Sequence, residues 1–179
     1  IKEGCINAKN EIIAIMDADG QHKVEDVIKA SEKLFAENFD IVIGSRFLSG
    51  ASIKGLCEER EKSSMLANKL ARYSLSGNYR NISDIMTGCI VLKRESCINF
   101  LEKMDVNGFK FLYELLSLSR GILKVGEIPI SFQPRKDGVS KLDIAVIWDF
   151  FVSLIHTLLK RLIPRKAVSF AFVGSMGVF

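Results

Sequence analysis

The sequence predicts an α/β fold in which helices cover a mostly parallel sheet. Its 179 residues suit one domain of this class and are too few for two full ones. Short apolar runs typical of buried strands alternate with helix-like segments along the chain, and this order favours parallel pairing. The shares of hydrophobic residues, 48%, and charged residues, 26%, exclude a disordered or fibrous chain.

Four segments are predicted to be strands. Residues 11–16, 40–44 and 88–92 are short apolar runs, which indicate strands buried on both faces. The fourth segment, 125–132, alternates in polarity and contains Pro129, which suits a strand at the margin of the sheet. The segments with helical spacing of apolar residues are 24–35, 58–75, 94–104 and 110–118.

Both ends of the sequence resemble cut ends. Residues 1–10 resemble the tail of a helix, and we expect the first strands of the fold to precede it. Residues 167–179 carry no charge and follow a basic cluster at 160–166, the order that marks the cytoplasmic start of a transmembrane helix. They are shorter than the span of about 20 residues that a bilayer requires. A terminal element of the core is the alternative interpretation.

The segment 142–163 is predicted to be an amphipathic helix that lies on a membrane surface. It is strongly apolar, contains Trp148 and ends in basic residues. An ordinary helix packed on the core would show the same periodicity, so both interpretations stay open. The formal net charge of +4 excludes a typical nucleic-acid binder, which needs a concentrated basic face.

Asp17, Asp19 and Gln21 form the sharpest motif, DADGQ, directly after the first predicted strand. Ligands of open α/β sheets bind beyond the carboxyl ends of strands. Two carboxylates one residue apart can approach one hard cation such as Mg²⁺ or Mn²⁺, and the Gln21 oxygen could add a ligand. An acidic turn that caps the following helix is the alternative.

A second cluster of polar residues follows the last predicted strand. The loop 135–141 contains Arg135, Ser140 and Lys141, whose donors suit a phosphate group. A solvated turn entering a helix is the alternative. Arg46, Arg60 and Asp84 lie at the ends of other elements, where each alone is more often a surface charge or a cap. The sequence has only two histidines, and it contains no nucleophile elbow, P-loop or GxGxxG motif. It therefore does not support a Ser/His/Asp hydrolase, a P-loop kinase or a dinucleotide-binding dehydrogenase.

The order of these motifs resembles glycosyltransferase family 2. DADGQ, GSRF, the helix headed by Arg60, SDIMTGCIVLKRE, GFKFLYELL and RKDGVSKL follow one another as they do in that family. Within it, the sequence is most similar to the polyprenyl-phosphate sugar transferases, of which the dolichol-phosphate mannose synthases are the best-known type. The similarity covers residues 4–148, and the tail FAFVGSMGVF resembles the start of a GtrA-like membrane domain.

The resemblance implies a GT-A fold, a Rossmann-like sheet that binds a sugar nucleotide. It implies three regions: a partial GT-A domain at 1–141, the interfacial helix at 142–163 and the start of a transmembrane domain at 167–179. Asp17, Asp19 and Gln21 would hold the metal. The residues that match phosphate-contacting positions for donor or acceptor are Arg46, Arg60, Arg135, Ser140 and Lys141. The implied catalytic residues are Asp19, Arg60 and Asp84, the last beside the acceptor pocket.

The implied reaction is inverting transfer of a sugar, with GDP-mannose as the expected donor, to the phosphate of a polyprenyl lipid. The cofactor would be Mg²⁺ or Mn²⁺, and the catalytic domain would lie at the cytoplasmic face of a membrane. The opening strand of the family and its nucleoside-binding segment have no counterpart here, so we expect the 179 residues alone to be inactive. The alternatives are a family 2 enzyme with a glucosyl or aminosugar donor and a polysaccharide acceptor, or a catalytically silent binding module.

Overall fold

The computed structural model describes residues 1–53, 58–104, 110–134 and 144–159. Its elements, in chain order, are α1 (Lys2–Asn7), β1 (Ile12–Met16), α2 (Val24–Ala36), β2 (Ile41–Ser45), β3 (Ser52–Ile53), α3 (Glu58–Ser74), the 3₁₀ turn η1 (Gly77–Tyr79), β4 (Cys89–Lys93), α4 (Arg94–Lys103), α5 (Phe111–Ser119), β5 (Val125–Pro129), β6 (Ser131–Phe132) and α6 (Ile144–Leu158). The predicted strands and helices are therefore confirmed, except that the last strand divides into β5 and β6 and that β3 was not predicted.

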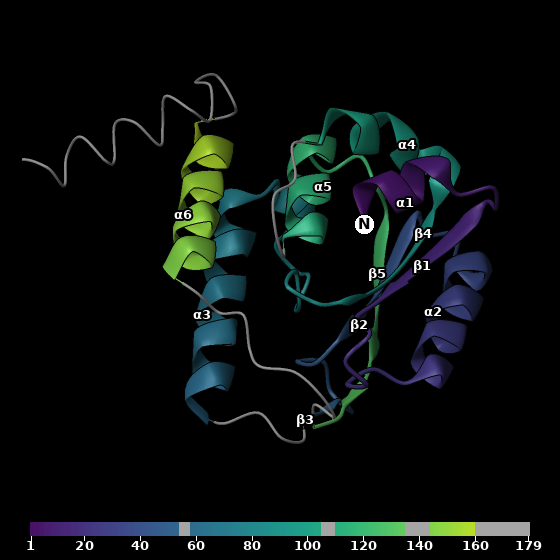
Figure 1. The fold of residues 1–179 in the computed structure, drawn as a ribbon, viewed down its shortest axis with the longest axis horizontal. Helices are drawn as coiled ribbons and strands as arrows, with labels where there is room; N and C mark the ends of the chain where they lie inside the picture. Colours follow the sequence, from purple (N-terminus) through teal and green to yellow (C-terminus); the bar gives the residue numbers. More distant parts are fainter. Residues whose placement is uncertain (54–57, 105–109, 135–143, 160–179) are drawn as a thin grey trace, which may run out of the picture.

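Helices cover both faces of a four-stranded sheet (Figure 1). Val42 and Val91 pack against Ala30 and Leu34 of α2 on one face. The neighbouring residues in the strands point to the opposite face, into a larger core shared with α3, α4, α5 and α6. Successive side chains of a strand point to opposite faces, so apolar runs such as IVI are buried on both sides. This alternation explains why β2 and β4 have no polar face.

The direction of β4 differs from the prediction. The strand order is β1-β4-β2-β5, and β4 runs antiparallel to both of its neighbours, whereas β2 and β5 are parallel. The expectation of mostly parallel pairing was therefore wrong, and the sheet is mixed. A strand buried on both faces has the same apolar pattern in either direction, so the pattern could not reveal this reversal. The place of β5 at the edge of the sheet is confirmed.

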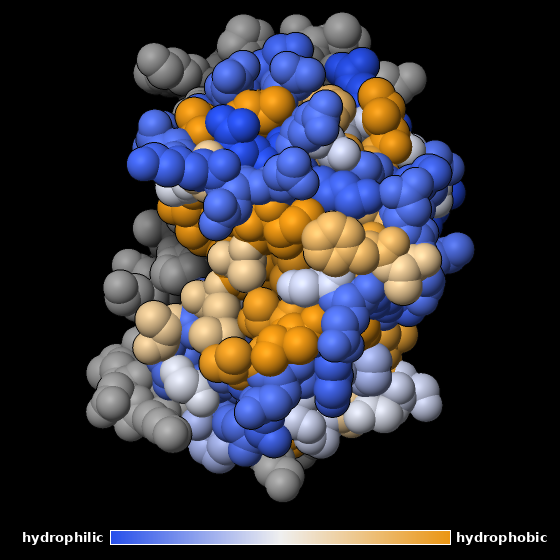
Figure 2. Space-filling view, turned by 90° about the vertical axis from the view of Figure 1, so that its right-hand side faces the viewer, coloured by the Kyte–Doolittle hydropathy of each residue, from blue (hydrophilic) through white to orange (hydrophobic). Residues whose placement is uncertain are grey.

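The opposite edge of the sheet is formed by β1. Ala14 and Met16 of this strand are exposed, so the expectation that residues 11–16 are buried on both faces was wrong. Helix α2 also exposes Val24, Ile28 and Phe35. The face of the molecule on the α2 side carries a band of apolar side chains (Figure 2). The edge strand β1 is therefore only partly buried, and some of its side chains remain in contact with solvent.

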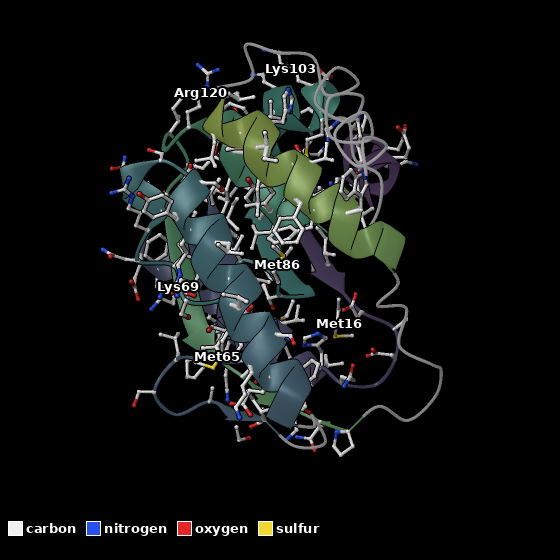
Figure 3. The ribbon with its side chains drawn as sticks, turned by 90° about the vertical axis from the view of Figure 1, so that its left-hand side faces the viewer. Met16, Met65, Lys69, Met86, Lys103 and Arg120 are labelled. Carbon is white, nitrogen blue, oxygen red and sulfur yellow. The ribbon has the colours of Figure 1, made fainter. Side chains whose placement is uncertain are left out.

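Helix α6 lies beside α3 (Figure 3). Lys110, just before α5, attaches it to the domain, because its ammonium group lies 2.6 Å from Asp149 Oδ2 and donates to the Asp149 carbonyl oxygen at 2.7 Å. Val152 and Leu154 are buried, whereas Phe151 and Leu158 are exposed. The predicted helix at 142–163 is thus seen over 144–158, with one side on the core. Within the described ranges, no helix is both long and apolar enough to cross a bilayer. Residues 167–179 lie outside those ranges.

Candidate active site

Four segments meet where strands β1, β2 and β5 end and β4 begins, because of the strand directions. This end of the sheet is called the site edge below, and it is distinct from the outer strands β1 and β5. Met16, the last residue of β1, pairs with Cys89, the first residue of β4. Ser45, at the end of β2, pairs with Pro129, at the end of β5. The chain therefore leaves β1, β2 and β5, and enters β4, at the site edge. This arrangement places the DADGQ turn, the residues after β2, the residues before β4 and the end of β6 in one region.

The DADGQ turn is held in a fixed shape. The Gln21 amide nitrogen donates to Asp19 Oδ1 at 3.1 Å, and Gly20 takes a φ of 76°, which a glycine adopts without strain. The N-cap residue of α2 is Lys23, and no side chain caps that helix. The interpretation of the acidic turn as a helix cap is therefore not supported. Instead, the turn presents an exposed Asp17 and a half-buried Asp19 at the site edge.

Gln21 ties this turn to the end of β6. Its side-chain amide donates to the Gln133 carbonyl oxygen at 3.1 Å, and the Gln133 amide nitrogen donates to the Gln21 carbonyl oxygen at 2.9 Å. Two residues separated by 112 positions are thus joined side by side. Gln133, which precedes Arg135 by two residues in the sequence, thus lies beside the acidic turn. Arg135, Ser140 and Lys141 themselves lie outside the described residues.

Gly88 provides the space that Asp17 occupies. A Cβ atom at Gly88 would lie 2.0 Å from Asp17 Oδ2 and 2.5 Å from its Cγ, far inside van der Waals contact. The Asp17 carboxylate therefore rests directly on the backbone that enters β4. The same oxygen, Oδ2, lies 4.0 Å from His22 Nε2. Gly88 and His22 were not among the predicted site residues.

His22 is buried beneath the acidic turn. Its side chain is 1% exposed, and its ring meets the Phe132 ring edge-on at 5.3 Å between centroids. Burial lowers the pKa of the His22 imidazole, although the nearby Asp17 and Asp19 carboxylates act in the opposite direction. The imidazole is therefore neutral at pH 7, and one of its nitrogens carries a hydrogen.

Arg46 and Asp84 form a bidentate ion pair at the site edge. Arg46 Nε lies 2.7 Å from Asp84 Oδ2, and its Nη2 lies 2.8 Å from Oδ1. Asp84 is fully buried and also accepts from the Arg46 amide nitrogen and from Asn68 Nδ2. The Arg46 guanidinium lies over the Phe132 ring, 5.4 Å from its centroid. The arrangement fixes the guanidinium plane and keeps the carboxylate away from solvent.

The structure thus brings Asp17, Asp19, Gln21, Arg46 and Asp84 to the site edge. Arg60 lies in the first turn of α3, and its side chain is outside the described part of the chain. The individual roles assigned to the predicted site residues stay predictions. The position of Asp84, buried beneath Arg46, favours a role in holding that arginine, because a group with no exposed atoms does not reach an acceptor.

A comparison with known protein families shows the family to which the chain belongs. The family model described as "Glycosyl transferase family 2" matches residues 1–101, which include β1, the acidic turn, α3 and β4. The chain belongs to this family. Its α/β fold with a mixed sheet is the GT-A-like fold that the resemblance implied.

Curated relatives of this family 2 chain include polyprenyl-lipid mannosyltransferases. It is 30% identical over 177 residues to the dolichol-phosphate mannosyltransferase of Pyrococcus furiosus, covering 98% of the chain and 48% of the relative. It is 32% identical to the polyprenol monophosphomannose synthase of Mycolicibacterium smegmatis, covering 73% and 49%. The yeast dolichol-phosphate mannosyltransferase is 33% identical, covering 86% and 57%. The chain spans about half the length of these relatives.

A solved structure with a similar fold is the glucosyl-3-phosphoglycerate synthase of Mycobacterium tuberculosis. Its complex with Mn²⁺, uridine diphosphate and glucosyl-3-phosphoglycerate superposes with a TM-score of 0.58 at 15% identity, covering 89% of this chain and 52% of the synthase. At this identity the likeness shows the fold alone. The family 2 chain and the synthase therefore share an architecture, and the substrates of the synthase are not transferred to the chain.

The residues at the site edge fit a divalent cation. Their donor atoms are carboxylate oxygens, which Mg²⁺ and Mn²⁺ prefer. The Gly88 backbone gives the Asp17 carboxylate room, and near it lies a neutral imidazole whose nitrogens have no hydrogen-bond partner among the described residues. In the described part of the chain, no three or more His, Cys, Asp and Glu side chains gather as a complete protein cage. A cation that also binds substrate phosphates is typically held by one or two protein carboxylates, and its remaining coordination positions are filled by phosphate and water oxygens.

Proposed function

We propose that the chain is the catalytic part of an inverting transferase that moves mannose from a nucleotide diphosphate to polyprenyl phosphate. The observation that carries the proposal is the pairing of Gln21 with Gln133, which joins the carboxylate turn to the start of the basic loop. Gln133, two residues before the basic loop in the sequence, therefore lies beside the acidic turn. The names of the mannosyltransferase relatives support the lipid acceptor and the choice of mannose. GDP-mannose as the donor is part of the proposal.

In the proposed reaction, the acidic turn binds the cation and the basic residues bind the acceptor phosphate. Asp17 and Asp19, with the Gln21 oxygen, would hold the Mg²⁺ or Mn²⁺ ion, which supplies charge neutralisation to the departing diphosphate when bound. Arg60, Arg135, Ser140 and Lys141 bind the acceptor phosphate and align it behind the anomeric carbon. The attacking oxygen already carries negative charge, so no strong general base is required. Attack from the side opposite the leaving group inverts the anomeric configuration.

Substitution of Asp19 tests this proposal. In the full-length protein, Asp19→Ala is expected to lower transfer of labelled mannose from GDP-mannose to polyprenyl phosphate by several orders of magnitude, because the carboxylate that holds the cation is lost. A matched control is Glu25→Ala, which removes an exposed carboxylate in the first turn of α2 and leaves transfer unchanged. Full transfer by the wild-type protein in excess chelator would contradict the metal role.

We further propose that α3 and α6 rest on the cytoplasmic surface of the membrane that holds the acceptor. The two helices lie side by side, and α3 exposes Met65, Leu66, Leu70 and Tyr73. Lys62 and Lys69 are exposed on the same helix. Figure 3 shows Met65 and Lys69 on the same side of α3. Apolar side chains bordered by lysines are typical of helices that lie in the headgroup region of anionic membranes.

A charge placed on this surface tests the membrane contact. Leu66→Asp is expected to lower transfer to polyprenyl phosphate in vesicles and to leave transfer in detergent solution unchanged, because a carboxylate opposes insertion into headgroups. Leu66 is 58% exposed, and Ile28 on α2, across the sheet, is 53% exposed. Ile28→Asp is therefore a matched control that should have no effect in vesicles. Equal losses for the two variants, or none for Leu66→Asp, would refute the proposed surface.

A further inference from the structure

The buried imidazole of His22 has no assigned task in the proposed reaction. Neither ring nitrogen has a hydrogen-bond partner among the described residues, although the side chain is 99% removed from solvent. Burial of a polar group without a hydrogen-bond partner is unfavourable. An apolar residue would fill the place against Phe132 without that cost. The presence of an imidazole here therefore calls for a partner that is incompletely engaged in this structure.

Asp17 is the group that can become this partner. Its Oδ2 atom lies 4.0 Å from His22 Nε2, about 1 Å beyond hydrogen-bond distance. The same oxygen lies so close to the Gly88 backbone that even a single added carbon there would collide with it. The Asp17 side chain is 59% exposed, so it has room to rotate and bring Oδ2 within reach of the imidazole N–H. One carboxylate oxygen thus lies against a backbone that limits its position and near a potential donor.

We propose that His22 is a positioning residue whose Nε2–H donates to Asp17 Oδ2 and holds that carboxylate in the orientation that binds the divalent cation. The inference rests on the proposed function. Partners of this kind behind a ligating group typically contribute 10–100-fold to metal affinity. Direct ligation of the cation by His22 is less suited to Mg²⁺ or Mn²⁺, which prefer oxygen ligands. The T-shaped packing of the ring against Phe132 restrains the orientation of the imidazole plane.

Two substitutions separate the hydrogen bond from the packing. His22→Phe keeps a ring against Phe132 and removes the donor, whereas His22→Gln places an amide N–H near the position of Nε2. The affinity for Mn²⁺ is measured in the full-length protein with GDP present, from the electron paramagnetic resonance signal of free Mn²⁺. We expect His22→Phe to weaken Mn²⁺ binding about 10-fold or more and His22→Gln to restore most of the affinity. The melting temperature of each variant reports any loss of folding.

The outcomes distinguish this inference from the proposed function. If wild-type protein binds Mn²⁺ and His22→Phe binds it equally well, or if His22→Gln is as weak as His22→Phe, the positioning role is refuted and the metal site stands. Coupling of bound Mn²⁺ to a directly coordinated imidazole nitrogen in pulsed measurements would also refute it. If the wild-type protein with GDP binds no Mn²⁺, the metal role in the proposed function fails, and the inference fails with it.

Discussion

Asp84→Ala is expected to lower the free energy of unfolding by about 3–5 kcal/mol, because it leaves a charged partner without compensation. The Asp84 side chain is fully buried, and the Arg46 side chain is only 11% exposed. The substitution also removes the acceptor of Asn68 Nδ2. Asn68 Oδ1 itself accepts from the amide nitrogen of Ile85 at 2.6 Å, so a disturbance at Asp84 spreads to the backbone that enters β4. Denaturant unfolding of the 179-residue chain measures the loss.

The control is a second ion pair between a cation and a carboxylate, which is exposed to solvent. Lys33 and Glu37 lie 3.3 Å apart on α2, and Glu37 is 53% exposed. Glu37→Ala is expected to change the free energy of unfolding by less than about 1 kcal/mol, because water replaces the lost partner. Similar losses for Asp84→Ala and Glu37→Ala would contradict the described burial. A direct catalytic task for Asp84 predicts instead that Asp84→Asn lowers kcat with no change in stability.

Gly88→Ala is expected to lower sugar transfer by about 100-fold, because a Cβ atom there displaces the Asp17 carboxylate. Asp17 is 59% exposed, so its side chain can swing into solvent and relieve the collision. The chain should therefore stay folded while the cation site is lost. Transfer by the full-length variant, together with its Mn²⁺ affinity, measures the effect.

Two other glycines separate this effect from general crowding. A Cβ atom at Gly77 would meet no heavy atom within 4 Å, so Gly77→Ala should leave both activity and stability unchanged. A Cβ atom at Gly44 would lie 2.6 Å from Ile130 Cγ2, inside the core, so Gly44→Ala should destabilise the fold without touching Asp17. If Gly88→Ala retains full Mn²⁺ affinity, the carboxylate of Asp17 is not the group that binds the cation.

The sequence revealed where the elements lie but not how β4 is directed. Ranges such as 40–44 and 88–92 were recognisable because a strand covered on both faces is a short continuous apolar run. The direction of that strand depends on the long connection through α3, which periodicity does not encode. The small pair of β3 with β6 was missed for a related reason, since two-residue strands are defined by their partner and not by their own pattern.

The site was predictable where the chemistry is local. Asp17 and Asp19 are recognisable from their place after a buried strand, and the resemblance to family 2 gave them their expected task. Gly88 and His22 were not identified, because their importance comes from contact with Asp17, and for Gly88 that contact joins residues far apart in sequence. A glycine immediately before a buried strand, and a histidine immediately after an acidic turn, were the available signals.

The interpretation of Asp84 changed for the same reason. As a lone carboxylate before a strand it was interpreted as a surface charge or a cap, and only the resemblance placed it beside the acceptor pocket. The antiparallel entry of β4 sets it beneath Arg46. Ion pairs between segments 38 residues apart are fixed by strand direction, which the sequence left open. The assignments of Arg60, Arg135, Ser140 and Lys141 rest on the resemblance, since these side chains lie outside the described part of the chain.

The identity of the acceptor is the central claim, and a competition assay tests it most directly. The full-length protein is given GDP-mannose and Mn²⁺ with equal concentrations of polyprenyl phosphate and 3-phosphoglycerate, a water-soluble phosphate monoester that also carries a carboxylate. The proposed function predicts that labelled mannose appears in the lipid fraction, joined to the acceptor phosphate with inverted anomeric configuration. Label that appears only on the soluble phosphate, or only as free mannose, would contradict it.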